Sequence, residues 1–472
     1  MLKELIAEDV IVGSGPCGYA AAKSIIALGR HPLIIDFGAS SNLGGSHIER
    51  TSSVAMKSDS LHTQVFDYPR TLITSIDGKH LPLSSARGGL SNIWGAGILL
   101  RNGEELPKLA PVWSGISSAY ESLLKEMPHV GAQDRTSIRF PWPTVSTKAP
   151  QSDRFKLMAE KLQYLDSGVL IGWPRVALEN NCVRCGACLH GCPLNLFHSS
   201  RVSLERLALD GHCSFVTGPV LTVGAEGGKP WLQTPTQMIF AKRIFVAAGP
   251  IATPTLLQRS NLVPKDILVR DSAVFYTGFI NTNTADGTEE TYTAAHLVAF
   301  SDRAGSDDFQ LAIYESNPEY ASRLTAIVPR LSRVLKVPTK LVAHINAGIG
   351  FLDSSVSGSL RLQYRNGRTW VSRIDSKIVR KEAQSVLARV ARTTKKHGLY
   401  PIPKLIVVPQ TGSGYHSGAS MPMGGELIKF DGSLNSAPGV YVIDASVLPE
   451  IWAGSHTFTA MANAYRIAKD AR

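Results

Sequence analysis

The stretch that decides the fold is EDVIVGSGPCGYAAAKSIIALGRHPLIIDFG, residues 8–38. Its pattern predicts a strand over 10–12, a tight turn, a helix over 20–28 and a second strand over 32–35. The turn carries Gly13, Gly15 and Gly18 in the spacing Gly-x-Gly-x-x-Gly, and Asp36 ends the second strand. Such glycines bring the backbone close to a pyrophosphate at the positive end of the helix, while the acid accepts ribose hydroxyls. The stretch therefore predicts a Rossmann-type unit for FAD or NAD; the alternative is a glycine turn that serves packing alone.

The composition sets the class of protein. The 472 residues suffice for two or three domains or for one large α/β enzyme, and the 44% hydrophobic residues and 41 glycines suit a loop-rich globular chain. No run approaches the roughly 18 apolar residues that span a bilayer. The first residues enter a strand directly, so we expect a cytoplasmic protein; export to the periplasm with a partner subunit is the alternative. The formal charge is +11, but the basic residues are scattered, so nucleic acid is not an expected partner.

A compact cysteine run, CVRCGACLHGCP, occupies residues 182–193 and contains four of the six cysteines. Such clustering indicates a metal site in a reducing compartment rather than a disulfide framework. The spacing C-x2-C-x2-C-x3-C-P favours a 4Fe–4S or 3Fe–4S cluster over zinc, because zinc sites usually draw on two separated pairs. Zinc, or reduced thiols without metal, are the alternatives, and Cys213 is a further candidate ligand. The predicted metal ligands are Cys182, Cys185, Cys188 and Cys192.

Two histidines near the C-terminus are the candidate catalytic residues. His416 lies in GSGYHSGAS (412–420) and His456 in AGSHTFTA (453–460), two small-residue loops on either side of a predicted strand over 440–443. Loops that flank one strand can meet in one pocket. A neutral imidazole is available at pH 7 to accept a proton.

Four segments together resemble the glucose–methanol–choline (GMC) family of FAD-dependent oxidoreductases. YHSGASMPMG (415–424) is similar to the first catalytic-histidine loop of that family, and VYVIDASVLPEIWAGSHTFTAMANAYRIA (440–468) to its second flavin signature and second catalytic loop. RGGLSNIWGAG (87–97) resembles the segment that lines the flavin, and RIFVAAGPIATPTLLQRSN (243–261) resembles the mid-chain adenine-side unit. The resemblance covers about half of the chain and is weak over 266–409.

The resemblance implies an α/β fold, α+β overall, with a discontinuous Rossmann-type FAD-binding domain. That domain would comprise residues 1–105, 166–265 and 410–472 and carry the cysteine loop 182–193. Residues 106–165 would form a lid or insertion, and 266–409 a sheet-based substrate domain. FAD would be bound non-covalently, because Ile93 stands where one branch of the family has its attachment histidine. The implied FAD-binding residues are Gly13, Gly15, Gly18, Asp36, Gly89, Ser91, Asn92, Trp94, Gly95, Val220, Ala248, Gly249, Asp444, Ala445, His456 and Thr457.

The implied reaction is oxidation of an alcohol, with a sugar or glycoside hydroxyl expected, by hydride transfer to the flavin N5. His416 would be the base and His456 would hydrogen-bond the same oxygen, although the two roles can be exchanged or shared. Some GMC dehydrogenases resemble this chain in having a cysteine-bound cluster beside the flavin. Electrons would then leave through the iron–sulfur cluster to an external acceptor, such as an acceptor protein. The alternatives are an oxidase with zinc or an empty cysteine loop, a redox-neutral lyase or epimerase, and a non-catalytic electron-transfer subunit.

Overall fold

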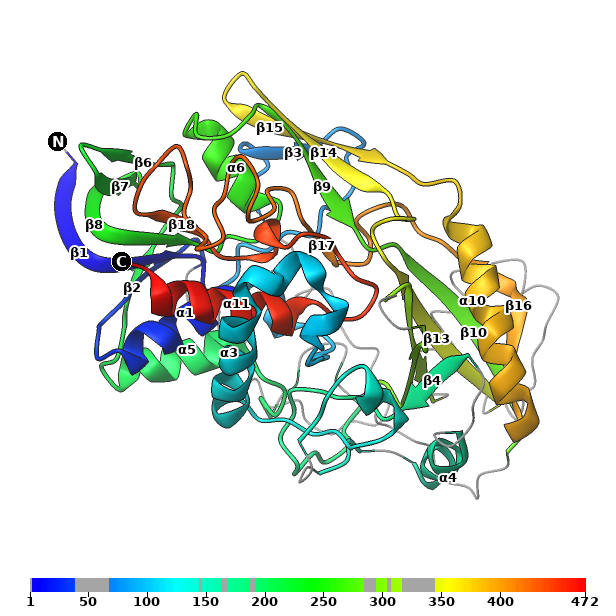
Figure 1. Ribbon diagram of the computed structural model, residues 1–472. Helices are drawn as coiled ribbons and strands as arrows, with labels where there is room; N and C mark the ends of the chain where they lie inside the picture. The colour runs from blue at the N-terminus through cyan, green and yellow to red at the C-terminus, as the bar shows by residue number, and fades with distance from the viewer. Residues whose placement is uncertain are drawn as a thin grey trace.

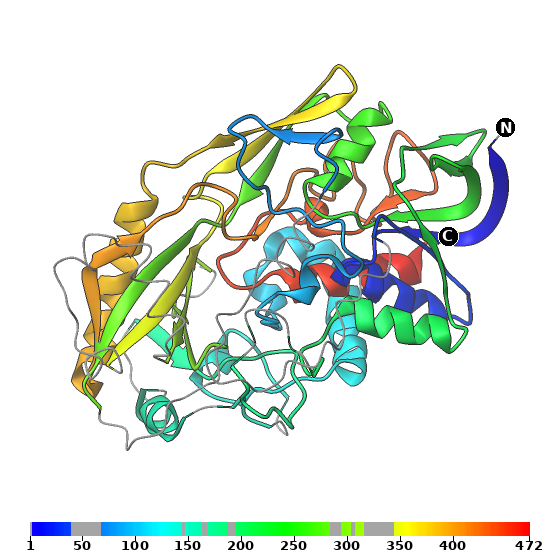
Figure 2. The same ribbon diagram turned by 180° about the vertical axis from the view of Figure 1, so that it is seen from behind.

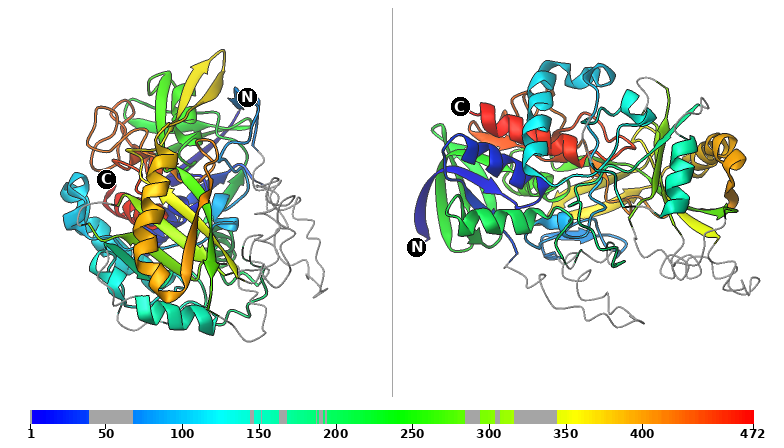
Figure 3. Two further views of the ribbon diagram at one scale, coloured as in Figure 1. Left: turned by 90° about the vertical axis from the view of Figure 1, so that its right-hand side faces the viewer. Right: turned by 90° about the horizontal axis from the view of Figure 1, so that it is seen from below.

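The computed structural model describes residues 2–38, 68–143, 147–150, 152–162, 168–186, 188, 192, 194–283, 294–303, 307–315 and 344–472. Three sheets organise this part of the chain. Figures 1 and 3 show that both termini lie at the end of the molecule that holds β1, while α10 lies at the opposite end. In the described part of the chain, no helix has the length and apolar character that crossing a membrane requires.

A seven-stranded sheet holds the N-terminal strand–turn–helix unit. Its order is β5-β2-β1-β8-β7-β6, with β18 also paired to β8. The predicted strand over 10–12 begins earlier, at Lys3, because β1 pairs with β8 from Lys3 onward while the outer half of β1 stays largely exposed. The parallel strands are β1 (Lys3–Val12), β2 (Leu33–Asp36), β5 (Ser214–Thr217), β8 (Gln237–Val246) and β18 (Val440–Val442), and the antiparallel ones are β6 (Thr222–Glu226) and β7 (Lys229–Gln233).

A layer of helices lies against this sheet (Figure 1). It consists of α1 (Pro16–Ala27), α3 (Trp113–Glu126), α5 (Ser200–Leu209) and α11 (Thr457–Asp470). The ring of Tyr120 on α3 stacks on Phe458 with centroids 5.2 Å apart, and the Tyr120 hydroxyl lies 2.6 Å from the hydroxyl of Thr459. The first half of the region 106–165 is therefore packed at the end of the molecule that holds the seven-stranded sheet. In the second half, Phe155 and Met158 of α4 (Asp153–Leu162) join the core of the second sheet.

The second sheet has six antiparallel strands in the order β16-β10-β13-β12-β11-β4. Its outer face is covered by α10 (Val379–Thr394), which buries Val386, Leu387 and Val390 against it (Figure 2). Within this sheet the strand that comes first in the chain is β4, which follows α4. The strands are β4 (Val169–Gly172), β10 (Val274–Asn281), β11 (Leu297–Ser301), β12 (Phe309–Tyr314), β13 (Ile345–Leu352) and β16 (Leu399–Val407).

The third sheet, in the order β17-β9-β14-β15-β3, links the two ends of the molecule. It packs on α6 (Ala252–Arg259) through a small apolar core that includes Ile251, Val269 and Leu360. Its strands are β3 (Ile73–Ser75), β9 (Asp266–Asp271), β14 (Ser359–Arg365), β15 (Arg368–Ile374) and β17 (Ser417–Gly418). The short 3-10 helices are η1 (Gly89–Asn92), η2 (Gly103–Glu105), η3 (Pro107–Val112), η4 (Arg135–Ile138), η6 (Lys395–His397) and η7 (Ala445–Val447).

Candidate active site

A cavity of about 900 Å³ lies between the seven-stranded and the six-stranded sheets. This volume is near the upper end of ordinary ligand pockets, as a dinucleotide requires. Both candidate catalytic histidines line it. Of the sixteen residues implied for FAD, Gly18 and Asn92 do not line it. Those that do are Gly13, Gly15, Asp36, Gly89, Ser91, Trp94, Gly95, Val220, Ala248, Gly249, Asp444, Ala445, His456 and Thr457.

The glycine turn is built for close backbone approach. Gly13 has φ +101°, and a Cβ there would lie 2.5 Å from the carbonyl oxygen of Ala247. A Cβ on Gly18 would overlap the carbonyl oxygen of Gly13, so this glycine serves the packing of α1 on β1 rather than the cavity wall. Asn92 is likewise a structural residue, because its side-chain amide donates to the carbonyl oxygens of Arg87 and Gly89, at 2.9 Å each.

Two helices begin at the cavity with uncapped N-termini. α1 follows Gly15 and α11 follows His456; neither has a side-chain cap or an acidic residue in its first turn. The first backbone N–H groups of a helix lack partners within the helix and carry partial positive charge. Both ends can therefore receive negative charge from a ligand, and the glycine turn before α1 suits a pyrophosphate.

Asp36 is locked to the glycine turn. Its carboxylate accepts hydrogen bonds from the backbone N–H groups of Ser14 and Gly38, at 2.9 Å each, and from the Ser14 hydroxyl. The Ser14 oxygen in turn accepts from the Gly88 N–H at 2.7 Å. Burial raises the pKa of Asp36 in spite of these bonds. Ser14 therefore links Asp36 and the glycine turn to the loop at Gly88 through its hydrogen bonds. The Gly-x-Gly-x-x-Gly motif gives no indication of this role, because Ser14 is at one of its variable positions.

Asp444 fixes the adjoining turn at the C-terminal end of β8. It accepts from the backbone N–H of Gly249 at 2.8 Å, from the Ser446 N–H at 2.9 Å and from the Thr253 hydroxyl. Burial raises its pKa. Asp444 thus holds the segment that follows β18 against the turn between β8 and α6, at the point where both line the cavity.

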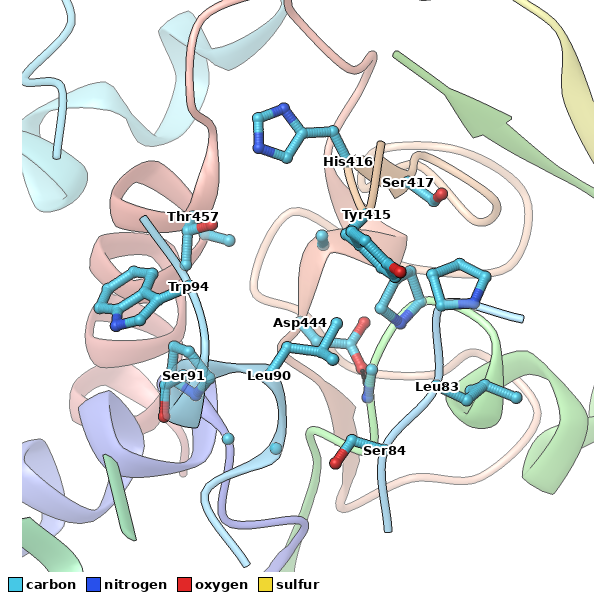
Figure 4. Close-up of a pocket in the computed structure, with 18 of the residues that line it drawn as sticks. Leu83, Ser84, Leu90, Ser91, Trp94, Tyr415, His416, Ser417, Asp444 and Thr457 are labelled. Atoms are coloured by element: carbon cyan, nitrogen blue, oxygen red, sulfur yellow. Dashed lines mark hydrogen bonds between the residues drawn. The ribbon is translucent and has the colours of Figure 1, made fainter. Parts of the chain in front are cut away.

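His416 and His456 meet, as the sequence predicts. Their ring centroids are 5.3 Å apart at an interplanar angle of 78°, and His416 stacks on Phe351 at 4.2 Å. Figure 4 shows the His416 ring turned toward the start of α11, where Thr457 lies. Burial lowers the pKa of His416 to about 4, and burial, His416 and Arg101 lower the pKa of His456. Both rings are therefore neutral at pH 7, and within the described structure each Nδ1 is buried without a hydrogen-bond partner.

A buried aspartate of β9 holds the His416 loop. Asp271 accepts from the Gly412 N–H at 2.7 Å and from the Ser417 hydroxyl at 2.9 Å. The neighbouring Ser272 N–H donates to the His416 carbonyl oxygen at 2.8 Å. Burial raises the pKa of Asp271 to about 6. This residue lies far from any motif, so the sequence offers no signal for it.

A buried ion pair holds the His456 loop in a similar way. The side chains of Arg101 and Asp307 are 4% and 5% exposed and contact each other directly. Arg101 donates to the Gly454 carbonyl oxygen at 2.8 Å, while Asp307 accepts from the Gly454 N–H at 3.2 Å. The guanidinium also lies over the Trp452 ring, 4.4 Å from its centroid. The ion pair thus hydrogen-bonds both the N–H and the carbonyl oxygen of Gly454, which lies two positions before His456.

The cysteine loop begins beside the cavity. Leu178 and Phe197 are bridged at its base, and the adjoining His198 carbonyl oxygen accepts from Trp94 Nε1 at 2.8 Å. The four cysteines form no disulfide and do not line the cavity; positions 187, 189–191 and 193 lie outside the described residues. Burial, and then the charges of Cys185 and Cys192, raise the pKa of Cys182. Among the described residues no group of three or more His, Cys, Asp or Glu is arranged to hold a metal ion, so the metal ligands stay a prediction.

A comparison with solved structures finds the crystal structure of pyridoxine 4-oxidase from Mesorbium loti similar to this chain. The TM-score is 0.61, the sequence identity is 13%, and the match covers 98% of both chains. No protein-family model and no curated protein matches the sequence. At this identity the likeness concerns the fold. The predicted fold class, α/β with a Rossmann-type unit in one sheet and further sheets beside it, is confirmed.

Proposed function

We propose that this chain is an FAD-dependent oxidoreductase of the GMC kind that oxidises the CH–OH group of an alcohol. One observation carries the proposal: the glycine turn, two uncapped helix N-termini and two buried neutral histidines all face the same cavity. The similarity to pyridoxine 4-oxidase along 98% of the chain supports it.

The residues of the cavity fit FAD. Only glycine fits at position 13, because a Cβ there would overlap the Ala247 carbonyl oxygen, and the N-terminus of α1 that follows this turn offers unpaired N–H groups to a pyrophosphate. Asp36 has acceptor capacity for ribose hydroxyls beyond its three hydrogen bonds. Bound FAD would supply the acceptor for the hydride that leaves the alcohol carbon.

The two histidines would handle the hydroxyl proton. Because burial keeps both rings neutral at pH 7, each has a lone pair to accept a hydrogen bond or a proton. We assign the base to His416, which is fixed by Phe351 and by the Asp271 network, and the orienting hydrogen bond to His456. Two interacting rings titrate as a pair, so shared roles are the alternative.

The test is anaerobic reduction of the purified flavoprotein by alcohols, followed by bleaching of the visible flavin absorption. His416→Ala and His456→Ala should each slow the reduction by about 10²–10⁴-fold, the usual contribution of a positioned acid or base. His31→Ala is the matched control, because this exposed histidine contacts Ser214 and does not line the cavity. Unchanged reduction rates in both cavity variants would refute the assignment.

The electron acceptor is a separate question, and the iron–sulfur cluster is our sequence-based proposal for it. The spacing of the four cysteines supports it, and so does the hydrogen bond from Trp94 to His198, which follows the cysteine loop in the chain. The described residues form no metal-holding group, so we derive no reaction step through a cluster. Iron and acid-labile sulfide in the purified protein would support a dehydrogenase. Zinc without sulfide, or rapid hydrogen peroxide formation in air, would support an oxidase.

A further inference from the structure

The face of the six-stranded sheet that borders the cavity includes two complete rows of side chains, and Tyr314 of β12 also lines the cavity next to the second row. Alternate residues of a strand point to the same face, and the strand registers align them across β10, β13, β12 and β11. All eight line the cavity. The first row is Val274, Phe351, Gln310 and Phe300, and the second is Tyr276, Ile349, Ala312 and Val298. We call these eight residues the inner face.

The inner face adjoins the two histidines through its first row. Phe351 stacks on the His416 ring, and the Gln310 side-chain oxygen accepts from the Ser455 N–H at 3.1 Å, next to His456. An alcohol whose oxygen lies between the histidines would therefore extend its body over the inner face. Six of the eight side chains there are wholly hydrocarbon, and Tyr276 adds a phenol ring.

The charged side chains that line the cavity lie outside the inner face. Asp36 and Asp444 lie at the nucleotide end, and Arg259 ends α6. Arg175 donates to the hydroxyls of Thr136 and Ser137, at 2.8 and 2.9 Å, and forms an ion pair with Asp134. These are the charged side chains among the described residues that line the cavity, apart from the histidines, and none of them belongs to the inner face. An ionic substituent that lies on the inner face therefore meets no counter-charge among its eight side chains.

We infer that the substrate is an uncharged alcohol with an apolar, aromatic body rather than a sugar. This inference rests on the proposed function and replaces the sugar or glycoside expected from the family resemblance. Each further hydroxyl of a sugar would lose its water and find few partners on the inner face, which disfavours binding. An aromatic body gains from leaving water and from packing on Phe300, Phe351 and Tyr276.

The test compares four alcohols in anaerobic reduction of the FAD-loaded protein: benzyl alcohol, cyclohexylmethanol, 4-(hydroxymethyl)benzoate and glucose. We expect kcat/KM to be highest for benzyl alcohol and at least ~100-fold lower for glucose and the benzoate, a typical discrimination against one misplaced polar group. Benzaldehyde, the product analogue, should perturb the flavin spectrum at concentrations where glucose does not.

A near-isosteric variant tests the inner face itself. Val298→Thr adds one hydroxyl to the second row and should lower kcat/KM for benzyl alcohol by about 10-fold while the FAD content is retained. Val408→Thr is the matched control; Val408 is a partly buried valine that packs on the same sheet core and does not line the cavity.

The outcomes separate this inference from the proposed function. Reduction by glucose at or above the rate with benzyl alcohol, or no spectral response to benzaldehyde, would overturn the inferred substrate class. If none of the four alcohols reduces bound FAD but benzaldehyde still perturbs its spectrum, the inferred binding chemistry stands and the proposed oxidation fails.

Discussion

Replacing Asp307 by asparagine should destabilise the protein strongly, because it leaves the guanidinium of Arg101 buried without a counter-charge. The two side chains are 4% and 5% exposed, so bulk water solvates the remaining charge poorly. Removing one member of a buried pair costs about 3–5 kcal/mol of unfolding free energy. The matched control is Asp266→Asn, which removes the partner of Arg361 in a pair whose side chains are 44% and 48% exposed. Such exposed pairs contribute about 0–1 kcal/mol.

The assay is the midpoint of thermal unfolding at one scan rate and one FAD concentration, with the FAD content and alcohol-dependent flavin reduction measured in parallel. We expect a much larger fall in midpoint for Asp307→Asn than for Asp266→Asn. We also expect slower reduction of the flavin by alcohol, because the hydrogen bonds of the pair to Gly454 position His456. The double variant Arg101→Met/Asp307→Leu should recover much of the midpoint, since it leaves no buried charge. Equal, small shifts in the two single variants would refute the reasoning.

Three further outcomes follow from the geometry. Gly13→Ala should lose FAD during purification, because φ is +101° and its Cβ would meet the Ala247 oxygen, whereas Gly29→Ala, with no atom within 4 Å, should keep its flavin absorbance. Asp271, with a pKa raised from 3.8 to about 6, binds more protons when folded. This carboxyl by itself therefore contributes a loss of up to about 3 kcal/mol of unfolding free energy as the pH rises from about 4 to about 6. The buried His416 and His456 act in the opposite direction over this range, so the contribution is read as the difference between the wild type and Asp271→Asn. Thermal unfolding at several pH values checks this, and a fall equally steep in Asp271→Asn would contradict it. Cys185→Ser should remove bound iron while bleaching of the flavin by alcohol continues; iron content equal to wild type would count against the cysteine assignment.

The parts of the site that the sequence predicted are local in the chain. The turn at Gly13 and Gly15, the acid at Asp36 and the start of α11 each depend on a few consecutive residues, whose φ angles and helix ends follow from residue type. The pairing of His416 with His456 was also predictable, because both flank one strand. The strand boundaries were less so: β1 extends to Lys3 because β8, more than two hundred residues later, pairs with it.

The sequence by itself determined the glycine turn at the start of α1, the two histidine loops and the cysteine spacing. Only the tertiary structure decided that Asp271 and the Arg101–Asp307 pair hold those loops, and that alternate residues of four strands form one apolar face. The physical reason is that these contacts join residues distant in the chain through strand register and packing, which no local spacing encodes. In each of these strands, alternate residues face the cavity, and the register between the strands aligns them into rows. These rows carry the inference about the kind of alcohol that the cavity favours.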